Sequence, residues 1–271
     1  MYIPHTRDEQ LASFGRLLDV LDILRVQCPW DRKQTNASLR PNTVEEVYEL
    51  SDALLREDSA DVQKELGDVL LHVIFYAKIG SEEGQFDIKE VCDRLTEKLI
   101  YRHPHIFGDK KVKDSHDVEQ NWEQLKLKEK GGNKTVLSGV PAALPSLIKS
   151  FRIQEKAANV GFDWDNPEDV WDKVYEELGE LRDELEGRHR DDHTDREIEF
   201  GDFLFSLVNA GRKYGIEADT ALSRTNDKFI RRFNHIERRA KEMGKELREM
   251  TLGEMDELYE EAKRLERADR Y

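Results

Sequence analysis

The chain has 271 residues, with 43 lysines and arginines against 58 aspartates and glutamates, so its formal net charge is −15. Charged residues make up 37% of the chain, its mean hydropathy is −0.77, and no apolar run approaches the roughly 20 residues that a membrane-spanning helix needs. This composition excludes a transmembrane protein, and it argues against direct nucleic-acid binding because so acidic a chain repels a phosphate backbone. We therefore expect any phosphate ligand to arrive with a metal ion.

The first residues and the cysteines favour a cytoplasmic protein. The chain starts MYIPHTRDEQ, which lacks the basic stretch and apolar core of a secretory signal. Its two cysteines, Cys28 and Cys92, cannot build a disulfide framework. Both features fit a reducing compartment, and we expect the protein to be cytoplasmic.

Two apolar stripes predict the main helices. Seven prolines and 16 glycines punctuate the chain, and the segments between them are rich in good helix formers. Over 60–77, and again over 198–211, apolar residues recur at steps of three and four, which is the spacing of one buried helical face. No strong period-two alternation competes with these stripes. We predict an all-α fold.

An internal repeat divides the chain into two similar halves. Four blocks recur in one order at offsets of 130 to 134 residues: 30–31 with 162–163, 45–49 with 176–180, 65–68 with 199–202, and 98–102 with 228–232. Between the halves, 130–134 and 138–141 are polar, glycine-bearing and helix-breaking. We predict an N-terminal domain at 1–130, a linker at 131–145 and a C-terminal domain at 146–271. Domains this small often complete their cores by association, so we expect a homodimer.

Each half carries a set of four carboxylates. One helix has Glu-x-x-Glu and the next has Glu-x-x-Asp, and residues three apart project from one face of a helix. An antiparallel arrangement would gather four acids in each half: Glu46, Glu49, Glu65 and Asp68, then Glu177, Glu180, Glu199 and Asp202. Two carboxylates about 5 Å apart repel by about 3 kcal/mol at an effective dielectric constant near 20. In a cleft they require a cation, and an all-oxygen ligand set favours Mg²⁺ or Mn²⁺.

Two other interpretations of the acids fit the sequence less well. Glu-rich helices are commonly solvated faces, but Gly67 and Gly201 lie between the acids in both halves although glycine costs a helix about 1 kcal/mol. We attribute these glycines to close packing at the acid pair. A carboxylate-bridged di-iron bundle requires Glu-x-x-His on two helices, and His72 has Ser206 as its counterpart, so that interpretation fails.

A cationic block follows the second set of acids, at 226–233. By itself it is typical of an exposed helix face. Beside a metal-loaded acidic cluster, however, lysine and arginine side chains are what a polyphosphate requires, because metals bind some of its oxygens and cations the others. The chain has neither GxxxxGK[ST] nor GxGxxG, so a nucleotide polyphosphate would be bound without a P-loop or a dinucleotide fingerprint.

These residues resemble the MazG family of nucleoside triphosphate pyrophosphohydrolases, within the all-α superfamily that also contains dimeric dUTPases and phosphoribosyl-ATP pyrophosphatases. The likeness covers nearly the whole chain, including 28–31, 45–49, 65–68, 102–107 and 159–164 and the acids and cations of the second half. It implies tandem four-helix domains that dimerise, as in the long bacterial form. It also implies Mg²⁺-dependent hydrolysis of nucleoside triphosphates to monophosphate and pyrophosphate, with broad base specificity and a role in cleaning the nucleotide pool.

Carried over by position, the resemblance implies a site in the second half. Its catalytic acids and Mg²⁺ ligands would be Glu177, Glu180, Glu199 and Asp202, and Glu46, Glu49, Glu65 and Asp68 form a second candidate metal site. The residues facing the triphosphate would be Lys173, Lys228, Arg231 and Arg232. Tyr259 stands where the family can place a nucleotide-contacting aromatic residue, usually Trp.

The first half lacks two of these four cations. It has Asn42 at the position of Lys173 and Tyr101 at the position of Arg231. We therefore predict that the second half carries most or all of the activity, while the first half still binds metal. The alternative hypothesis is a regulatory module that holds nucleotide and Mg²⁺ without turnover, or a scaffold for a partner protein. Intact acids in both halves favour catalysis.

Overall fold

The computed structural model describes residues 4–114, 117–118, 121–122, 125, 135–187 and 193–268. The chain divides into two compact units, Met1–Val118 and Glu119–Tyr271. All regular elements in these described ranges are helices, which confirms the predicted all-α fold. None of the described helices is both long and apolar enough to cross a membrane. Part of the predicted linker, 131–134, lies outside the described residues, and the domain boundaries remain a prediction.

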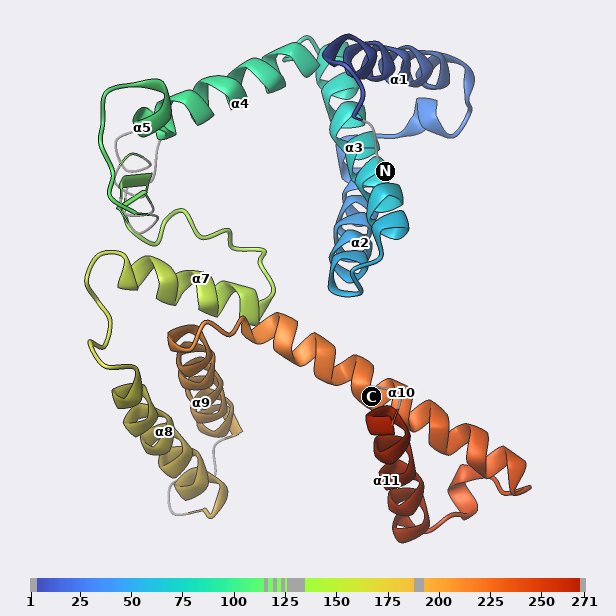
Figure 1. Cartoon of the computed structure of the whole chain (residues 1–271), viewed down its shortest axis with the longest axis vertical. Coiled ribbons are helices and arrows are strands. Elements are labelled where there is room, and N and C mark those ends of the chain that lie inside the picture. The colour runs from blue at the N-terminus through green and yellow to red at the C-terminus, as the bar shows by residue number, and fades with distance from the viewer. Residues whose placement is uncertain are drawn as a thin grey trace. The chain divides into compact units, whose positions relative to one another are not determined.

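The first unit is built around an antiparallel pair of helices, α2 and α3 (Figure 1). Its described elements are α1 (Arg7–Gln27), a 3₁₀ turn (Asp31–Lys33), α2 (Asn36–Leu55), α3 (Ser59–Glu82), α4 (Ile88–Arg102) and α5 (Pro104–Phe107). Side chains cap the first turns: Thr35 accepts from the N–H of Ser38, and Asp58 accepts from the N–H groups of Ala60 and Asp61. α2 ends at Leu55 and α3 begins at Ser59, so the Asp58 cap and the short turn beside it set where the acids of the two helices face each other.

The core of the first unit lies on one side of this hairpin. Leu21 of α1, Leu39 of α2 and Ile74, Phe75 and Ile79 of α3 form one buried apolar cluster. At its edge the Arg25 guanidinium donates to the Glu82 carboxylate and to the backbone carbonyls of Asp31 and Gln34. These charge-assisted bonds fasten α1 to the end of α3.

The second unit repeats the hairpin and adds a further helix pair (Figure 1). Its described elements are α7 (Ser146–Ala158), a 3₁₀ turn (Pro167–Asp169), α8 (Val170–Leu185), α9 (His193–Lys213), α10 (Ala218–Glu242), a 3₁₀ turn (Leu247–Glu249) and α11 (Leu252–Ala268). Two separate apolar clusters form. Val170, Val174 and Ala210 join α8 to α9, whereas the other cluster joins α10 to α11 through Ile236, Ala240, Met250 and Leu258.

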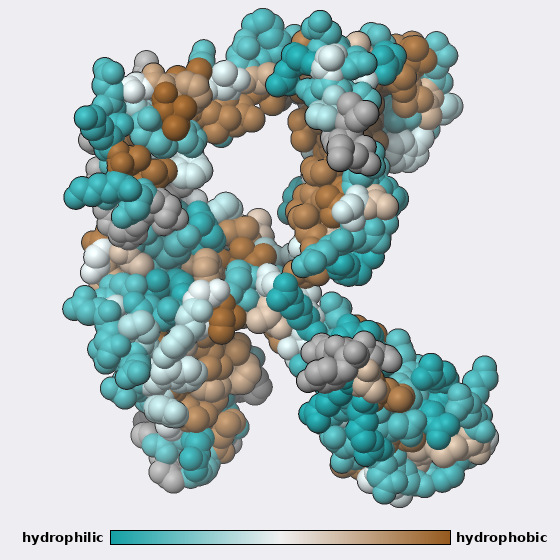
Figure 2. Space-filling view, in the orientation of Figure 1, coloured by the Kyte–Doolittle hydropathy of each residue, from teal (hydrophilic) through white to brown (hydrophobic). Residues whose placement is uncertain are grey.

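The predicted apolar stripes are only partly buried. Ile74 and Ala77 in α3 and Val208 in α9 are buried, as expected. Leu66 is 53% exposed, however, and other members of the two stripes are also exposed: Leu70, Val73, Ile198, Leu204 and Leu207. Apolar atoms gather over α3 in one unit and over the α8–α9 hairpin in the other (Figure 2). The other helices of each unit pack on only part of the surface of α3 and α9, so a single chain covers each stripe only in part.

The glycines between the acids have a different setting from the one predicted. A Cβ atom built on Gly67 or Gly201 would meet no atom of the described chain within 4 Å, apart from its own helix backbone and chain neighbours. Close packing at the acid pair therefore does not explain these glycines within one chain. Both positions lie on helices whose apolar residues are also exposed.

Candidate functional site

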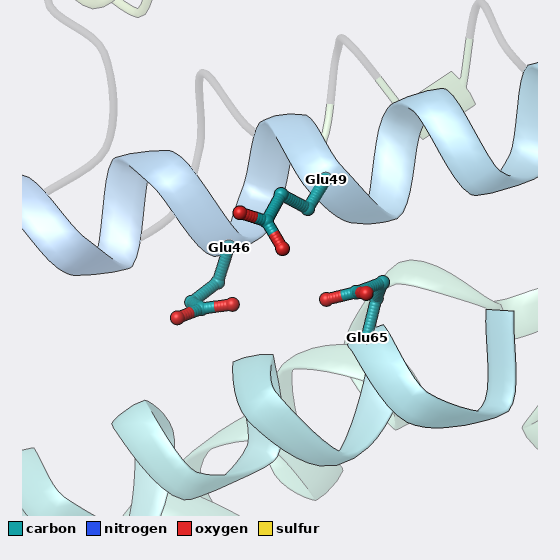
Figure 3. Close-up of side chains that lie close together, drawn as sticks. All are labelled: Glu46, Glu49 and Glu65. Carbon is teal, nitrogen blue, oxygen red and sulfur yellow. The ribbon is translucent and has the colours of Figure 1, made fainter. Parts of the chain in front are cut away.

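The first acid cluster spans the α2–α3 hairpin. Glu46 and Glu49 of α2 and Glu65 of α3 each offer a carboxylate oxygen, and these three oxygens lie within 4.8 Å of one another. Figure 3 shows the three carboxylates converging from the two helices. Glutamates three apart on α2 share a face, and the antiparallel partner brings Glu65 opposite them. The predicted gathering of acids thus occurs, with Asp68 outside the closest trio.

Burial and repulsion both act on this first cluster. Burial raises the pKa of the Glu46 carboxyl. The negative charges of Asp68, Glu49 and Glu65 raise the pKa of the same group further, so all four predicted acids share one electrostatic field. Glu65 itself is only 5% exposed, and its buried Oε2 has no hydrogen-bond partner among the described residues.

The second acid cluster spans the α8–α9 hairpin. Here oxygens of Glu177, Glu199 and Asp202 lie within 4.8 Å of one another. Burial raises the pKa of Glu199, and the nearby charges of Glu180, Asp202 and Glu177 add to that shift. Glu177 is 6% exposed, and within the described chain its buried Oε2 also lacks a hydrogen-bond partner. Glu180 contributes its charge to this pKa shift, but its carboxylate is not one of the three that converge.

Both clusters have the donors that a hard divalent cation requires. Every converging ligand atom is a carboxylate oxygen, and each cluster has one nearly buried oxygen that no described group satisfies. Leaving a charged oxygen buried and unpaired is costly, so a cation bound there would remove a large penalty. The residues fit Mg²⁺ or Mn²⁺, with Glu46, Glu49 and Glu65 in one hairpin and Glu177, Glu199 and Asp202 in the other.

The four side chains predicted to bind phosphate lie at two places in the second unit: the second acid cluster and helix α10. Lys173 lies at the second acid cluster, with its Nζ 2.6 Å from Glu177 Oε1 and 3.0 Å from Glu176 Oε1. Lys228, Arg231 and Arg232 lie on α10. Within the second unit the structure thus brings one of the four predicted phosphate-binding side chains directly to the acids.

Arg232 and Tyr259 contact each other across α10 and α11. The Arg232 guanidinium lies 5.3 Å from the centroid of the Tyr259 ring. Its Nε and a terminal nitrogen donate to Glu266 Oε2 at 3.0 and 2.7 Å, and Arg231 Nε lies 3.8 Å from the same carboxylate. Lys263 Nζ lies 5.1 Å from the Tyr259 ring centroid. Tyr259 therefore contacts two cations in this unit.

Two further residues lie at the acids and were not predicted from the sequence. Lys64 Nζ lies 2.6 Å from Glu65 Oε1, although Lys64 has Ile198 as its counterpart in the repeat. Glu184, one turn beyond Glu180 on α8, contributes to the raised pKa of Glu199 and has a buried Oε2 without a hydrogen-bond partner in the described ranges. The spacing Glu180-x-x-x-Glu184 is the signal that could have found this fifth acid.

Comparison with known proteins identifies these hairpins. The sequence profile of the MazG nucleotide pyrophosphohydrolase domain matches residues 34–107 and again 165–237, so that each match contains one acid-bearing hairpin. The chain belongs to the MazG family. The two matches confirm the tandem repeat and the resemblance that the motifs indicated.

Relatives of the MazG family align over most of the chain. The nucleoside triphosphate pyrophosphohydrolase of Escherichia coli strain K12 is 42% identical over 94% of this chain and 99% of its own length. The nucleoside triphosphate pyrophosphohydrolase/pyrophosphatase MazG of Thermotoga maritima is 42% identical over 92% of this chain and 95% of its own. The uncharacterized protein YabN of Bacillus subtilis is 46% identical over 98% of this chain, which matches 55% of that protein.

The raised pKa of Glu199 generates a prediction about metal-free protein. A carboxyl whose pKa is raised in the folded state favours folding below its ordinary pKa, and this contribution is lost as the pH rises through the raised value. At pH 7 with a chelator, Glu199→Gln should therefore melt at a higher temperature than the parent, and the difference should disappear below about pH 4.5. With Mn²⁺ present, the variant should gain less stability than the parent.

Thermal melts at pH 4–8, with chelator or with Mn²⁺, measure both effects. Glu237→Gln, at an exposed position of α10, is the matched control and should leave the pH dependence unchanged. A Glu199→Gln variant that melts below the parent at pH 7 in chelator would contradict the electrostatic account of the cluster.

Proposed function

We propose that this chain hydrolyses nucleoside triphosphates to the monophosphate and pyrophosphate, using Mg²⁺ or Mn²⁺ bound at the acids of the second half. One observation carries the proposal: a family-matched hairpin holds three converging carboxylates, and one of them has a buried oxygen without a partner in the described chain. Both pyrophosphohydrolase relatives extend over more than nine-tenths of the chain, which supports the same activity. We expect broad base specificity and a cytoplasmic location.

In this proposal the acidic residues act on the metal ion and the attacking water, and the basic residues act on the phosphates and the leaving pyrophosphate. A divalent ion held at these acids would supply Lewis-acid polarisation of a phosphoryl oxygen and would make the attacking water more acidic. Glu177, Glu180, Glu199 and Asp202 would hold the ion, and one of the glutamates would orient the attacking water and take its proton. Lys173, Lys228, Arg231 and Arg232 bind the phosphates and stabilise the negative charge that develops on the departing pyrophosphate.

The first half is proposed to bind metal without efficient turnover. Its acids converge as closely as those of the second half, but Asn42 and Tyr101 replace two phosphate-binding cations. Two lost charge-assisted hydrogen bonds of about 1.5–3 kcal/mol each would weaken transition-state stabilisation by about 3–6 kcal/mol. That corresponds to a rate lower by about a hundredfold to ten-thousandfold.

We also propose that the active protein is a homodimer. Leu66, Leu70 and Val73 in α3, and Leu204 and Leu207 in α9, are exposed apolar side chains on helices that carry the acids. Gly67 and Gly201 also have open space above them, which leaves room for a second copy to approach closely. Burying these surfaces between two copies would remove apolar area from water and extend each small core.

The first prediction concerns the products. A mixed panel of nucleoside triphosphates should yield monophosphate and pyrophosphate in equal amounts with Mg²⁺ or Mn²⁺, and neither product in excess chelator. Chromatography of the nucleotides together with a coupled pyrophosphate assay measures both. Orthophosphate in place of pyrophosphate, from a preparation free of inorganic pyrophosphatase, would show attack at a different phosphorus and refute the proposal.

The second prediction separates the two halves. Glu177→Ala or Asp202→Ala should reduce kcat at least a hundredfold, whereas Glu46→Ala or Asp68→Ala should leave most of it, because the first half lacks two phosphate-binding cations. Circular dichroism and oligomeric state serve as folding controls for these four matched variants. Equal losses from both pairs in folded protein would show two working sites.

The third prediction concerns assembly. Light scattering should report twice the chain mass of 31.7 kDa. Leu70→Glu or Leu204→Glu should shift the protein towards the monomer, because each places a charge on the exposed apolar surface. Leu252→Glu, at an 80% exposed position at the start of α11, is the control that should leave the mass unchanged. A fully active parent monomer at nanomolar concentration would contradict the dimer.

A further inference from the structure

Each acid cluster contains one lysine that contacts its most buried glutamate. Lys173 Nζ lies 2.6 Å from Glu177 Oε1, and Lys64 Nζ lies 2.6 Å from Glu65 Oε1. The two lysines are not equivalent in the repeat. Asn42 stands at the position of Lys173, and Ile198 stands at the position of Lys64. The same pairing has therefore arisen twice, from different helices and towards different glutamates.

A buried carboxylate accounts for this repetition. Glu177 and Glu65 are among the few buried charged residues, and an ionised group in such a place needs a positive partner. In both glutamates one oxygen meets the lysine, while the other is buried and has no hydrogen-bond partner among the described residues. The lysine therefore provides a partner for only one of the two carboxylate oxygens. A divalent ion contacting both oxygens or bridging to the neighbouring acids would satisfy more of it.

The contacts of Lys173 keep its ammonium charged. Bonds to Glu177 and then Glu176 raise the pKa of Lys173 above its ordinary value. Lys173 also keeps substantial exposure, with 40% of its side chain accessible, so it can turn away from the acids without unpacking a core. Lys64 is more exposed still, at 64%.

We propose that Lys173 and Lys64 are the counterions of Glu177 and Glu65 in the metal-free protein, and that a divalent metal ion displaces them. In the second half, the displaced Lys173 then becomes available to a substrate phosphate. Metal binding and nucleotide binding are thereby coupled through one side chain. The exchange at the acids rests on the geometry of the clusters, and the second step rests on the proposed function.

The exchange predicts effects of opposite sign for one substitution. Removing the lysine removes the metal ion's competitor, so Lys173→Met should bind Mn²⁺ about tenfold more tightly than the parent when no nucleotide is present. The same variant should show a KM for nucleoside triphosphate raised about tenfold at saturating Mn²⁺, because the phosphate loses its ammonium partner. If Lys173 had only a structural role, its removal would weaken both Mn²⁺ binding and nucleotide binding.

Electron paramagnetic resonance of free Mn²⁺ in titrations of the full chain at pH 8 measures the first effect. Glu65→Gln in all proteins of this series silences the first cluster, so that one site is followed. Lys173→Arg keeps the charge and should bind Mn²⁺ within about threefold of the parent. Lys245→Met removes a lysine that lies 2.6 Å from Glu254, away from both clusters, and should leave Mn²⁺ affinity unchanged.

The first cluster supplies an independent test. Lys64→Met, in a chain whose second cluster is silenced by Glu177→Gln, should also bind Mn²⁺ more tightly. Because the Lys64 side chain is 64% exposed, its replacement should not disturb folding, which circular dichroism checks. Unchanged or weaker Mn²⁺ binding by both folded lysine variants would overturn the exchange. If Lys173→Met binds Mn²⁺ more tightly but has an unchanged KM, the second step, in which displaced Lys173 binds a substrate phosphate, would be overturned. The Mn²⁺ titrations contain no nucleotide, so absence of pyrophosphate release by the parent would defeat the proposed function alone.

Discussion

A nearly buried carboxylate in each helical hairpin is the constraint on which the candidate sites depend. Glu65 and Glu177 are held at 5% and 6% exposure, with neighbouring acids close by. A charged group buried in this way is costly unless a positive partner lies beside it. The paired lysine supplies that charge in part, and a divalent ion can supply it more completely. The proposed metal and substrate binding would therefore act on the stability of the chain through the same carboxylates.

The hairpins also link the site to assembly. α3 and α9 each carry acids towards their partner helix and expose apolar residues such as Leu66, Leu70 and Leu204 elsewhere. The helices that carry the acids thus also expose apolar side chains in a single chain. If a second copy covers the apolar surfaces, dimerisation will stabilise the geometry of the acids as well as the fold.

The sequence predicted the acid clusters well because helix periodicity and the repeat act on the same residues. In Glu-x-x-Glu and Glu-x-x-Asp the two acids share one helix face, and this holds whichever other helices pack nearby. Lys64 was not predicted, because the prediction relied on residues that both halves share. The second half has Ile198 at the position of Lys64. The contact of Arg232 with Glu266 depends on the packing of α10 against α11, for which the sequence has no repeat signal. Periodicity identifies the apolar face that contains Leu66, but it does not identify what covers that face.

The most direct test of the account is the position of a divalent ion at the second cluster. Crystals of the full chain soaked in Mn²⁺ would locate the ion by its anomalous scattering. The account predicts a peak in contact with the carboxylates of Glu177, Glu199 and Asp202, with the Lys173 ammonium moved away from Glu177. An empty cluster at saturating Mn²⁺, with Lys173 still in contact with Glu177, would contradict it.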